Sequence, residues 1–192
     1  MPEIEKHPWK PFLPEGGRLL MLGSFPPQPK RWSMEFYYPN RSNMMWEVMG
    51  SVFYGDSGRL LSDDGKGFNL AEIKQLLSDK GIGMYDTATA VRRLADNASD
   101  KELEVVERTD IAELLRSMPG CHDIACTGTK SAEEVCEEYG LAVPKMGEHC
   151  EGSIGNRQVR IWRMPSTSRA YPMALPRKAE YYLRLMSAVG IL

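Results

Sequence analysis

The chain has 192 residues, of which 42% are hydrophobic, so it can bury one full core without needing a second domain. Its 24 Lys and Arg residues against 26 Asp and Glu give a formal net charge of −2, which excludes an overall attraction to a phosphate backbone. We therefore expect a single domain over residues 1–192, with an N-terminal extension over residues 1–17. Any DNA-binding surface must come from local sorting of charge.

Residues 1–14 mix charged residues with prolines, and no apolar run approaches the length needed to span a membrane. We therefore expect a cytoplasmic protein that has no signal peptide and no membrane partner. The cysteines are separated by four, nine and thirteen residues, which is not the paired short spacing of a zinc site. We expect no metal and no other cofactor, and reduced structural thiols at Cys121, Cys126, Cys136 and Cys150.

Short apolar runs alternate with amphipathic segments along the chain. Buried strands are predicted over residues 18–25, 82–85, 123–127 and 158–163. Helices are predicted to begin near Asn43, after a cap at Asn69, at a capping box of Ser131 and Glu134, and near Pro176. This alternation predicts an α/β fold with three α/β/α layers around a central, mainly parallel four-stranded sheet.

In a parallel sheet, ligands bind outside the carboxyl ends of the strands. This rule selects four loops, which span residues 23–29, 86–93, 128–130 and 164–171. No Gly-x-Gly-x-x-Gly or Walker-type loop is present in the sequence, which argues against dinucleotide or ATP use.

The first of these loops begins with Gly-Ser-Phe-Pro-Pro at residues 23–27. A glycine lets the backbone come close to a ligand, and the two prolines make the loop rigid. The aromatic pair Tyr37 and Tyr38 comes next, and Asn43 lies between this pair and Trp46. The arrangement resembles the first motif of hypoxanthine-DNA glycosylases. It thus indicates the hypoxanthine-type and mismatch-specific (thymine/uracil) branch of the uracil-DNA glycosylase superfamily.

Two further segments resemble the other motifs of this superfamily. The strand over residues 81–87 resembles the family's second strand, whose polar end points into the base pocket, and Asp86 occupies that end. Arg92, Arg93 and the polar residues 97–100 follow it. Residues 165–168 (Pro-Ser-Thr-Ser) resemble the last motif, whose loop contacts phosphates. The three motifs stand in the family's order and cover nearly the whole chain, from about residue 19 to the final helix.

The resemblance implies a monofunctional DNA glycosylase, which hydrolyses the N-glycosidic bond of a deaminated or mismatched base in base excision repair. Hypoxanthine and uracil are the implied bases. In this hypothesis Asn43 is the catalytic residue, because its amide can orient the attacking water although it cannot take up a proton as a carboxylate would. The implied base-binding residues are Gly23, Ser24, Phe25, Tyr37, Tyr38 and Asp86. The implied phosphate-binding residues are Ser166, Thr167, Ser168 and Arg169.

The chain also departs from the family pattern. Ser24 and Phe25 stand where the more active branches have Asp, Glu or Asn, and residues 40–42 are Asn-Arg-Ser in place of His-Pro-Arg. A loop without a carboxylate predicts a slow enzyme that relies on binding and base flipping. Residues 152–179 contain six Arg and Lys but no Asp or Glu, which predicts a DNA-facing basic stripe. The expected partner is DNA containing a damaged base, bound by a monomer.

Each of these residues also has a simpler interpretation. Asn43 can cap its helix, and Asp86 can pair with Arg92 or Arg93. One of the two tyrosines is expected to be a packing residue, and residues 165–168 can be only a turn that starts a helix. Two other functions are therefore kept: a lesion-binding protein of the same fold with weak catalysis, and a nucleoside or nucleotide hydrolase on a doubly wound sheet.

Overall fold

A computed structural model describes residues 3–94 and 103–192 of the chain. The polar residues 97–100 singled out above lie outside the described residues. Among the helices of the described residues, none is both long and apolar enough to cross a membrane.

The central sheet has five strands in the order β3-β2-β6-β8-β7, of which β3, β2, β6 and β8 are parallel. β7 pairs antiparallel with β8 and forms one edge. The expectation of a four-stranded sheet is therefore wrong: the sheet is five-stranded and mixed. β7 has no apolar run because alternate residues of this edge strand are exposed. The strands are β2 (Leu19–Gly23), β3 (Ile82–Asp86), β6 (Asp123–Cys126), β7 (His149–Ile154) and β8 (Arg157–Arg163).

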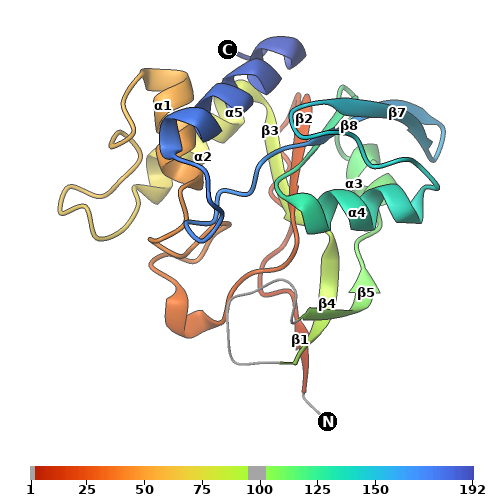
Figure 1. Cartoon of the computed structure of the whole chain (residues 1–192), viewed down its shortest axis with the longest axis horizontal. Helices are drawn as coiled ribbons and strands as arrows, with labels where there is room; N and C mark the ends of the chain where they lie inside the picture. Colours follow the sequence, from red (N-terminus) through yellow and green to blue (C-terminus); the bar gives the residue numbers. More distant parts are fainter. Residues whose placement is uncertain (1–2, 95–102) are drawn as a thin grey trace.

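Helices cover both faces of this sheet. Figure 1 shows α1, α2 and α5 grouped on one side of the strands, with α3 and α4 on the other. A short 3-10 helix, η1, lies in the loop after β2. The bounds are η1 (Pro29–Arg31), α1 (Met45–Tyr54), α2 (Leu70–Lys80), α3 (Ile111–Arg116), α4 (Thr129–Glu138) and α5 (Leu175–Val189).

Of the four predicted helix starts, three are confirmed and one is wrong, and α1 begins two residues after Asn43. The side chain of Asn69 accepts a hydrogen bond from the backbone N–H of Glu72, as expected of a cap. Pro176 lies in the first turn of α5. Ser131, however, is inside α4 and donates to the carbonyl of Gly128 instead of capping the helix. Gly128 lets the chain turn into α4 soon after β6, so the helix begins earlier than the capping-box pattern predicts.

A second, smaller sheet extends from the carboxyl edge of the main one. It is antiparallel, in the order β1-β4-β5, and Figure 1 shows it continuing beyond β3. β4 begins two residues after β3 ends, so β3 continues almost directly into it. The strands are β1 (Ile4–Lys6), β4 (Ala88–Arg93) and β5 (Leu103–Arg108). Part of the expected N-terminal extension thus belongs to the fold, because β1 pairs with β4 and Phe12 forms a bridge with Met84.

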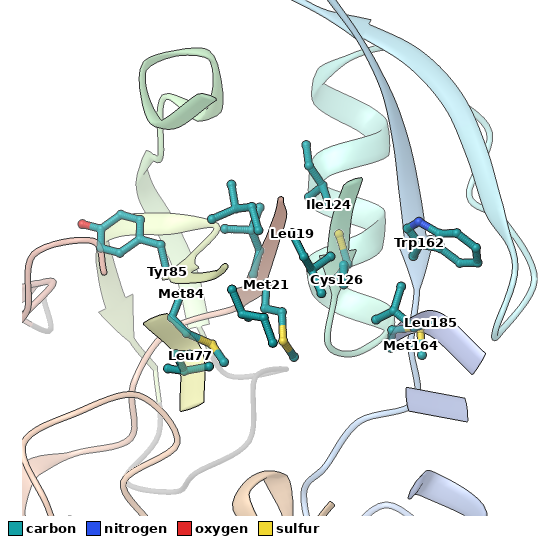
Figure 2. Packing of buried hydrophobic residues seen from close by; sticks show 14 of the residues in the cluster. Leu19, Met21, Leu77, Met84, Tyr85, Ile124, Cys126, Trp162, Met164 and Leu185 are labelled. Atoms are coloured by element: carbon teal, nitrogen blue, oxygen red, sulfur yellow. The ribbon is translucent and has the colours of Figure 1, made fainter. Parts of the chain in front are cut away.

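One main core fills the space between the central sheet and its helices. Figure 2 shows Met21, Met84 and Leu77 gathered on one side of the strands, while Tyr85 points away from Met84. This alternation follows from the two-residue period of a strand. The thiols are free: Cys150 is half-buried, and burial raises the pKa of Cys121 to about 11 and that of Cys126 well above its usual range. Among the described residues, no group of His, Cys, Asp and Glu could hold a metal ion.

Candidate functional site

The carboxyl edge of the parallel strands brings together the loops that the sequence selected. Gly23 ends β2 and Asp86 ends β3, and the two residues are register partners in the sheet. Thr127 follows β6 and Met164 follows β8, and the backbone N–H of Met164 donates to the carbonyl of Cys126. The three motifs found in the sequence therefore meet at one edge of the sheet, as the general rule for parallel sheets predicts.

Gly23 lets Asp86 approach the end of β2. A Cβ atom at position 23 would lie 2.4 Å from Oδ1 of Asp86 and 3.3 Å from the hydroxyl of Tyr38. No side chain fits there, so the glycine is required for the close approach of these two groups. Asp86 is only 6% exposed, and its other oxygen, Oδ2, lies 2.9 Å from Nε2 of His7. Oδ1 of Asp86 and the hydroxyl of Tyr38 therefore both lie next to the backbone of Gly23, at the end of β2.

The two adjacent tyrosines have different roles. Tyr37 is 2% exposed, and its hydroxyl donates to the carbonyl of Lys10, so it is the packing residue of the pair. Burial raises the pKa of Tyr37 well above its usual range, with a smaller contribution from Asp86. Tyr38 is half-buried at the site and places its hydroxyl 2.7 Å from Oγ1 of Thr127. Thr127 donates to the carbonyl of Leu22, so its oxygen accepts from Tyr38.

Asn43 stands at the start of α1 and is half-buried. Its Oδ1 accepts a hydrogen bond from the backbone N–H of Met45, at 2.9 Å. This contact agrees with the simpler interpretation, in which the asparagine satisfies an amide at the helix start. The Nδ2 amide makes no hydrogen bond within the described part of the chain and keeps both of its hydrogens for a water or a ligand.

The loop after β8 is held against the start of α1. The backbone N–H of Met44, next to Asn43, donates to the carbonyl of Thr167 at 2.9 Å. Thr167 itself is only 1% exposed, so its side chain packs inside the loop. Ser166 and Ser168 are half-buried, and their hydroxyls accept from backbone amides of the same loop. These turn-like contacts shape the loop, while Gly128 lies close to Ser166 across from it.

Arg169 is the exposed cation of this loop. Its side chain is 58% exposed, Nε donates to the carbonyl of Ser42, and the guanidinium lies 3.8 Å from the carboxylate of Glu47. Both contacts join the last motif to the segment that precedes Asn43. The guanidinium therefore has exposed donors beside the two loops.

Lys178 supports the same loop from behind, and sequence reasoning missed this role. It is 0% exposed, and its ammonium donates to the carbonyl of Ser168 at 2.6 Å. Burial lowers the pKa of Lys178, and the nearby Arg169 lowers it further. Its spacing to Tyr182 and Leu185, which are buried on the same helix, was the available signal.

The six basic residues of the predicted DNA-facing stripe do not share one surface. Arg157 stands at the opposite end of β8 and donates to the carbonyls of Leu115, Met118 and Cys121. Arg160 pairs with Asp123, and Lys178 is buried, so neither is a surface cation facing the site. A run of basic residues in the sequence becomes a stripe only if its side chains share a face, and these residues alternate across a strand before entering a loop and a helix. Arg169 lies beside the start of α1, and Arg163, at the end of β8, donates to the hydroxyl of Thr129.

The partner of Asp86 is His7, which the sequence did not single out. The alternative pairing with Arg92 or Arg93 is wrong, because Arg92 pairs with Glu104 and Arg93 pairs with Glu5. His7 is 79 residues distant in the sequence, and no motif marks it. Only the pairing of β1 with β4 brings it to the end of β3.

Phe25 and Ser24 lie on the outer side of the loop after β2. Phe25 packs edge-on against His7 and also lines a cavity of about 520 Å³ with Pro8, Pro26, Pro27 and Trp32. Asp86 and Tyr38 do not line this cavity. The carbonyl of Ser24 lies 3.5 Å from the hydroxyl of Thr87, which donates to the carboxylate of Glu134. The loop itself has no carboxylate, but Asp86 and Glu134 bring two to its neighbourhood from other elements.

Comparisons with known proteins agree with this architecture. No protein-family model matches the sequence, and no curated protein does. Among solved structures, the chain is similar to the solution NMR structure of a Methanosarcina acetivorans protein with a provisional uracil DNA glycosylase assignment. The TM-score is 0.61 and the identity 20%, and the alignment covers 96% of this chain and 99% of that chain. The chain has a uracil DNA glycosylase-like fold.

Within this uracil DNA glycosylase-like fold, the expected site residues divide into two groups. The contacts described above join the end of β2, Tyr38, the start of α1 and the loop after β8 into one surface. Tyr37 and Thr167 are buried behind that surface, and Phe25 packs to one side of it. The members of the first group are Gly23, Tyr38, Asn43, Asp86, Ser166, Ser168 and Arg169.

Proposed function

We propose that this protein is a DNA glycosylase that hydrolyses the N-glycosidic bond of a deaminated or mismatched base, with hypoxanthine and uracil as its substrates. The observation that carries the proposal is the approach of Asp86 and Tyr38 at the end of β2 in a uracil DNA glycosylase-like fold, with the residue next to Asn43 bonded to the loop after β8 at the same edge of the sheet. The partner is DNA containing the damaged base. The expected monomeric state and the cytoplasmic location stay predictions from the sequence.

The chemistry requires few groups from the protein. A water oxygen adds to C1′ of the sugar as the C–N bond breaks, and the electron pair of that bond leaves with the base. The second product is an abasic sugar, and a proton of the water ends on the released base. The Nδ2 amide of Asn43 donates to the water oxygen and orients it. Oδ1 of Asp86 accepts from a ring N–H of the base, and Tyr38 packs against it.

The surrounding loops supply contacts to the DNA backbone. Ser166, Ser168 and Arg169 are positioned beside the start of α1, where a hydroxyl and a guanidinium can bind phosphates that flank the extruded base. These contacts are local, so they do not require the whole chain to have a positive net charge.

A second candidate function is supported by one observation. Oδ1 of Asn43 is already engaged with the N–H of Met45, and the loop after β2 has no carboxylate, so neither of these two elements can take up a proton from the water. A protein of this kind can bind a damaged base and release it very slowly. The second candidate is therefore a lesion-binding protein of the same fold.

The test is base release from labelled duplex and single-stranded oligonucleotides that carry one hypoxanthine, uracil, xanthine or mismatched thymine. We expect the wild type to release at least one of these bases and Asn43→Ala to release none. Tight binding of the modified duplex without release would favour the second candidate. Absence of both binding and release would contradict the DNA repair proposal.

Asn69→Ala is the matched control, because Oδ1 of Asn69 also accepts from a backbone N–H in the first turn of a helix, that of Glu72 in α2. Loss of either hydrogen bond is expected to lower the free energy of unfolding by about 1 kcal/mol. Only Asn43→Ala should abolish base release. Equal activities in the two folded variants would show that Asn43 only accepts the N–H of Met45 at the helix start and has no part in base release.

A further inference from the structure

His7 is a buried imidazole attached to the site by a side-chain contact. The side chains of His7 and Asp86 are 2% and 9% exposed, and Nε2 of the imidazole lies 2.9 Å from Oδ2 of the carboxylate. The backbone of His7 is fixed by a hydrogen bond from its N–H to the carbonyl of Thr89, directly after β1. The ring is therefore held at the end of β3 by the segment that directly follows β1.

Aromatic rings on several sides prevent the imidazole from turning. The ring centroid of Tyr85 lies 4.6 Å from that of His7, and the centroid of Phe25 lies 5.5 Å away. The rings of Trp9 and Tyr37 lie at 6.0 Å each. A cage of this kind fixes the plane of the imidazole and keeps water away from its hydrogen bond to Asp86.

The carboxylate of Asp86 determines the direction of this hydrogen bond. A carboxylate oxygen can only accept, so Nε2 carries a hydrogen and donates it to Oδ2. On the other side of the ring, Nδ1 lies 2.8 Å from the carbonyl oxygen and 3.1 Å from the backbone nitrogen of Trp9. The backbone of Trp9 therefore holds the imidazole from the side opposite Asp86.

The hydrogen bond to His7 leaves Asp86 with one oxygen for a ligand. Oδ2 is occupied, while Oδ1 faces the bare backbone of Gly23. An acceptor fixed at this point favours a base that presents a ring N–H and repels one that presents a ring nitrogen lone pair. Uracil, thymine, hypoxanthine and xanthine have this N–H next to a carbonyl, whereas cytosine and adenine have a lone pair at the equivalent nitrogen.

We propose that His7 is a positioning residue that orients the Asp86 carboxylate and thereby selects bases with a ring N–H next to a carbonyl. This proposal rests on the function proposed above and adds the determinant of base choice. His7 acts through Asp86 and does not touch the base. Removal of a residue that orients a functional group typically costs about 10-fold to 100-fold in activity.

The experiment compares His7→Phe with His7→Gln, using duplexes that contain uracil or N3-methyluracil. Phenylalanine fills the aromatic cage without a donor, whereas the glutamine amide can still donate to Asp86. We expect His7→Phe to lower kcat/KM for uracil by about 10-fold to 100-fold. We also expect the preference for uracil over its N3-methyl analogue to fall by the same factor, and His7→Gln to restore most of both. A purely structural role would lower release of the two bases equally.

Asp86→Asn with His7 unchanged provides a second test, which does not depend on the folding of the His7 variants. With His7 present, the amide oxygen of the new side chain accepts from Nε2, so its NH2 group faces the base. Release should then shift from uracil to cytosine, which has a lone pair at that nitrogen. In Asp86→Asn combined with His7→Phe the amide is no longer oriented, and the shift should be lost.

The outcomes separate the two proposals. A wild type that releases no base would contradict the glycosylase function and this role of His7 together. A wild type that releases uracil, with an unchanged preference over N3-methyluracil in folded His7→Phe, would overturn the role of His7 alone. Restoration by His7→Gln would support it.

Discussion

The polar side chains at the two ends of the central sheet differ in how many of their hydrogen-bonding positions are occupied. At the amino end, Asp123 receives hydrogen bonds from Arg160 at 2.8 and 2.9 Å and from the indole of Trp162 at 2.7 Å. Arg157 donates to three backbone carbonyls nearby. At the carboxyl end, the one side-chain partner of Asp86 among residues 3–94 and 103–192 is His7, and Asn43 uses only its oxygen within the same residues.

This difference shows where the fold leaves room for a ligand. A carboxylate that has all of its acceptor positions occupied stabilises the structure but can bind nothing more. Groups at the carboxyl end are buried or half-buried and oriented, yet they keep unused hydrogen-bonding capacity. Substitutions at the amino end should therefore change stability, and substitutions at the carboxyl end should change function.

The largest expected effect is at the amino end. Asp123→Ala removes the partner of Arg160 and leaves the indole N–H of Trp162 without an acceptor, so the free energy of unfolding should fall by about 2 to 4 kcal/mol. Urea denaturation measures this loss. Base release per folded molecule should be unchanged, because Asp123 lies at the first residue of β6, at the far end of the strand from the site. A large loss of activity in the folded variant would break the division between the two ends.

A smaller change in stability, with a larger change in activity, is expected from Thr127→Val. The substitution keeps the shape of the side chain but removes the hydroxyl that accepts from Tyr38, so stability should fall by about 1 kcal/mol. Base release should fall about 10-fold, because Tyr38 loses its anchor, at about 1.4 kcal/mol per factor of ten. Tyr38→Phe removes the other partner and is expected to behave alike. The double variant should lose little more than either single one, and full additivity of the two losses would contradict the coupling.

The smallest expected effect is on the salt dependence of DNA binding. Arg169→Ala should lower the slope of log K against log salt concentration by about 0.9, the change for one phosphate contact to duplex DNA. Arg116→Ala is the control, because Arg116 has a similarly exposed side chain on α3 and also neighbours a glutamate. Binding titrations at several salt concentrations measure both variants. Identical slopes for both would show that Arg169 does not contact phosphate.

Much of the fold could be predicted because the parallel strands are continuous apolar runs. β2, β3 and β6 consist of buried residues throughout, and such runs carry a strong signal. β1, β5 and β7 were missed because they are short or have several residues exposed. β4, whose residues are all buried or half-buried, was wrongly predicted to be part of a loop over residues 86–93. In these strands, pairing with a neighbour determines the structure, and a single sequence does not show its pairing partners.

The site could be predicted only where it consists of local segments. The loops at residues 23–27 and 164–169 were found because each follows a recognisable strand. His7 and Lys178 were missed because their roles depend on contacts across the fold, to Asp86 and to Ser168. The basic run at residues 152–179 failed in the opposite way, since closeness in sequence did not place its side chains on one surface.

Tyr38 has a φ of +52°, the only non-glycine residue with a positive φ among those that the structure describes. This conformation costs a residue with a side chain about 1 to 2 kcal/mol. The contacts of Tyr38 with Thr127 and Trp46 offset this cost. In a Thr127→Val background one of these contacts is lost, so selection for survival of heating should there accept glycine or asparagine at position 38, whereas selection for base release should retain tyrosine. The residues that survive each selection would show how far the hydrogen bond to Thr127 offsets the cost of this backbone conformation.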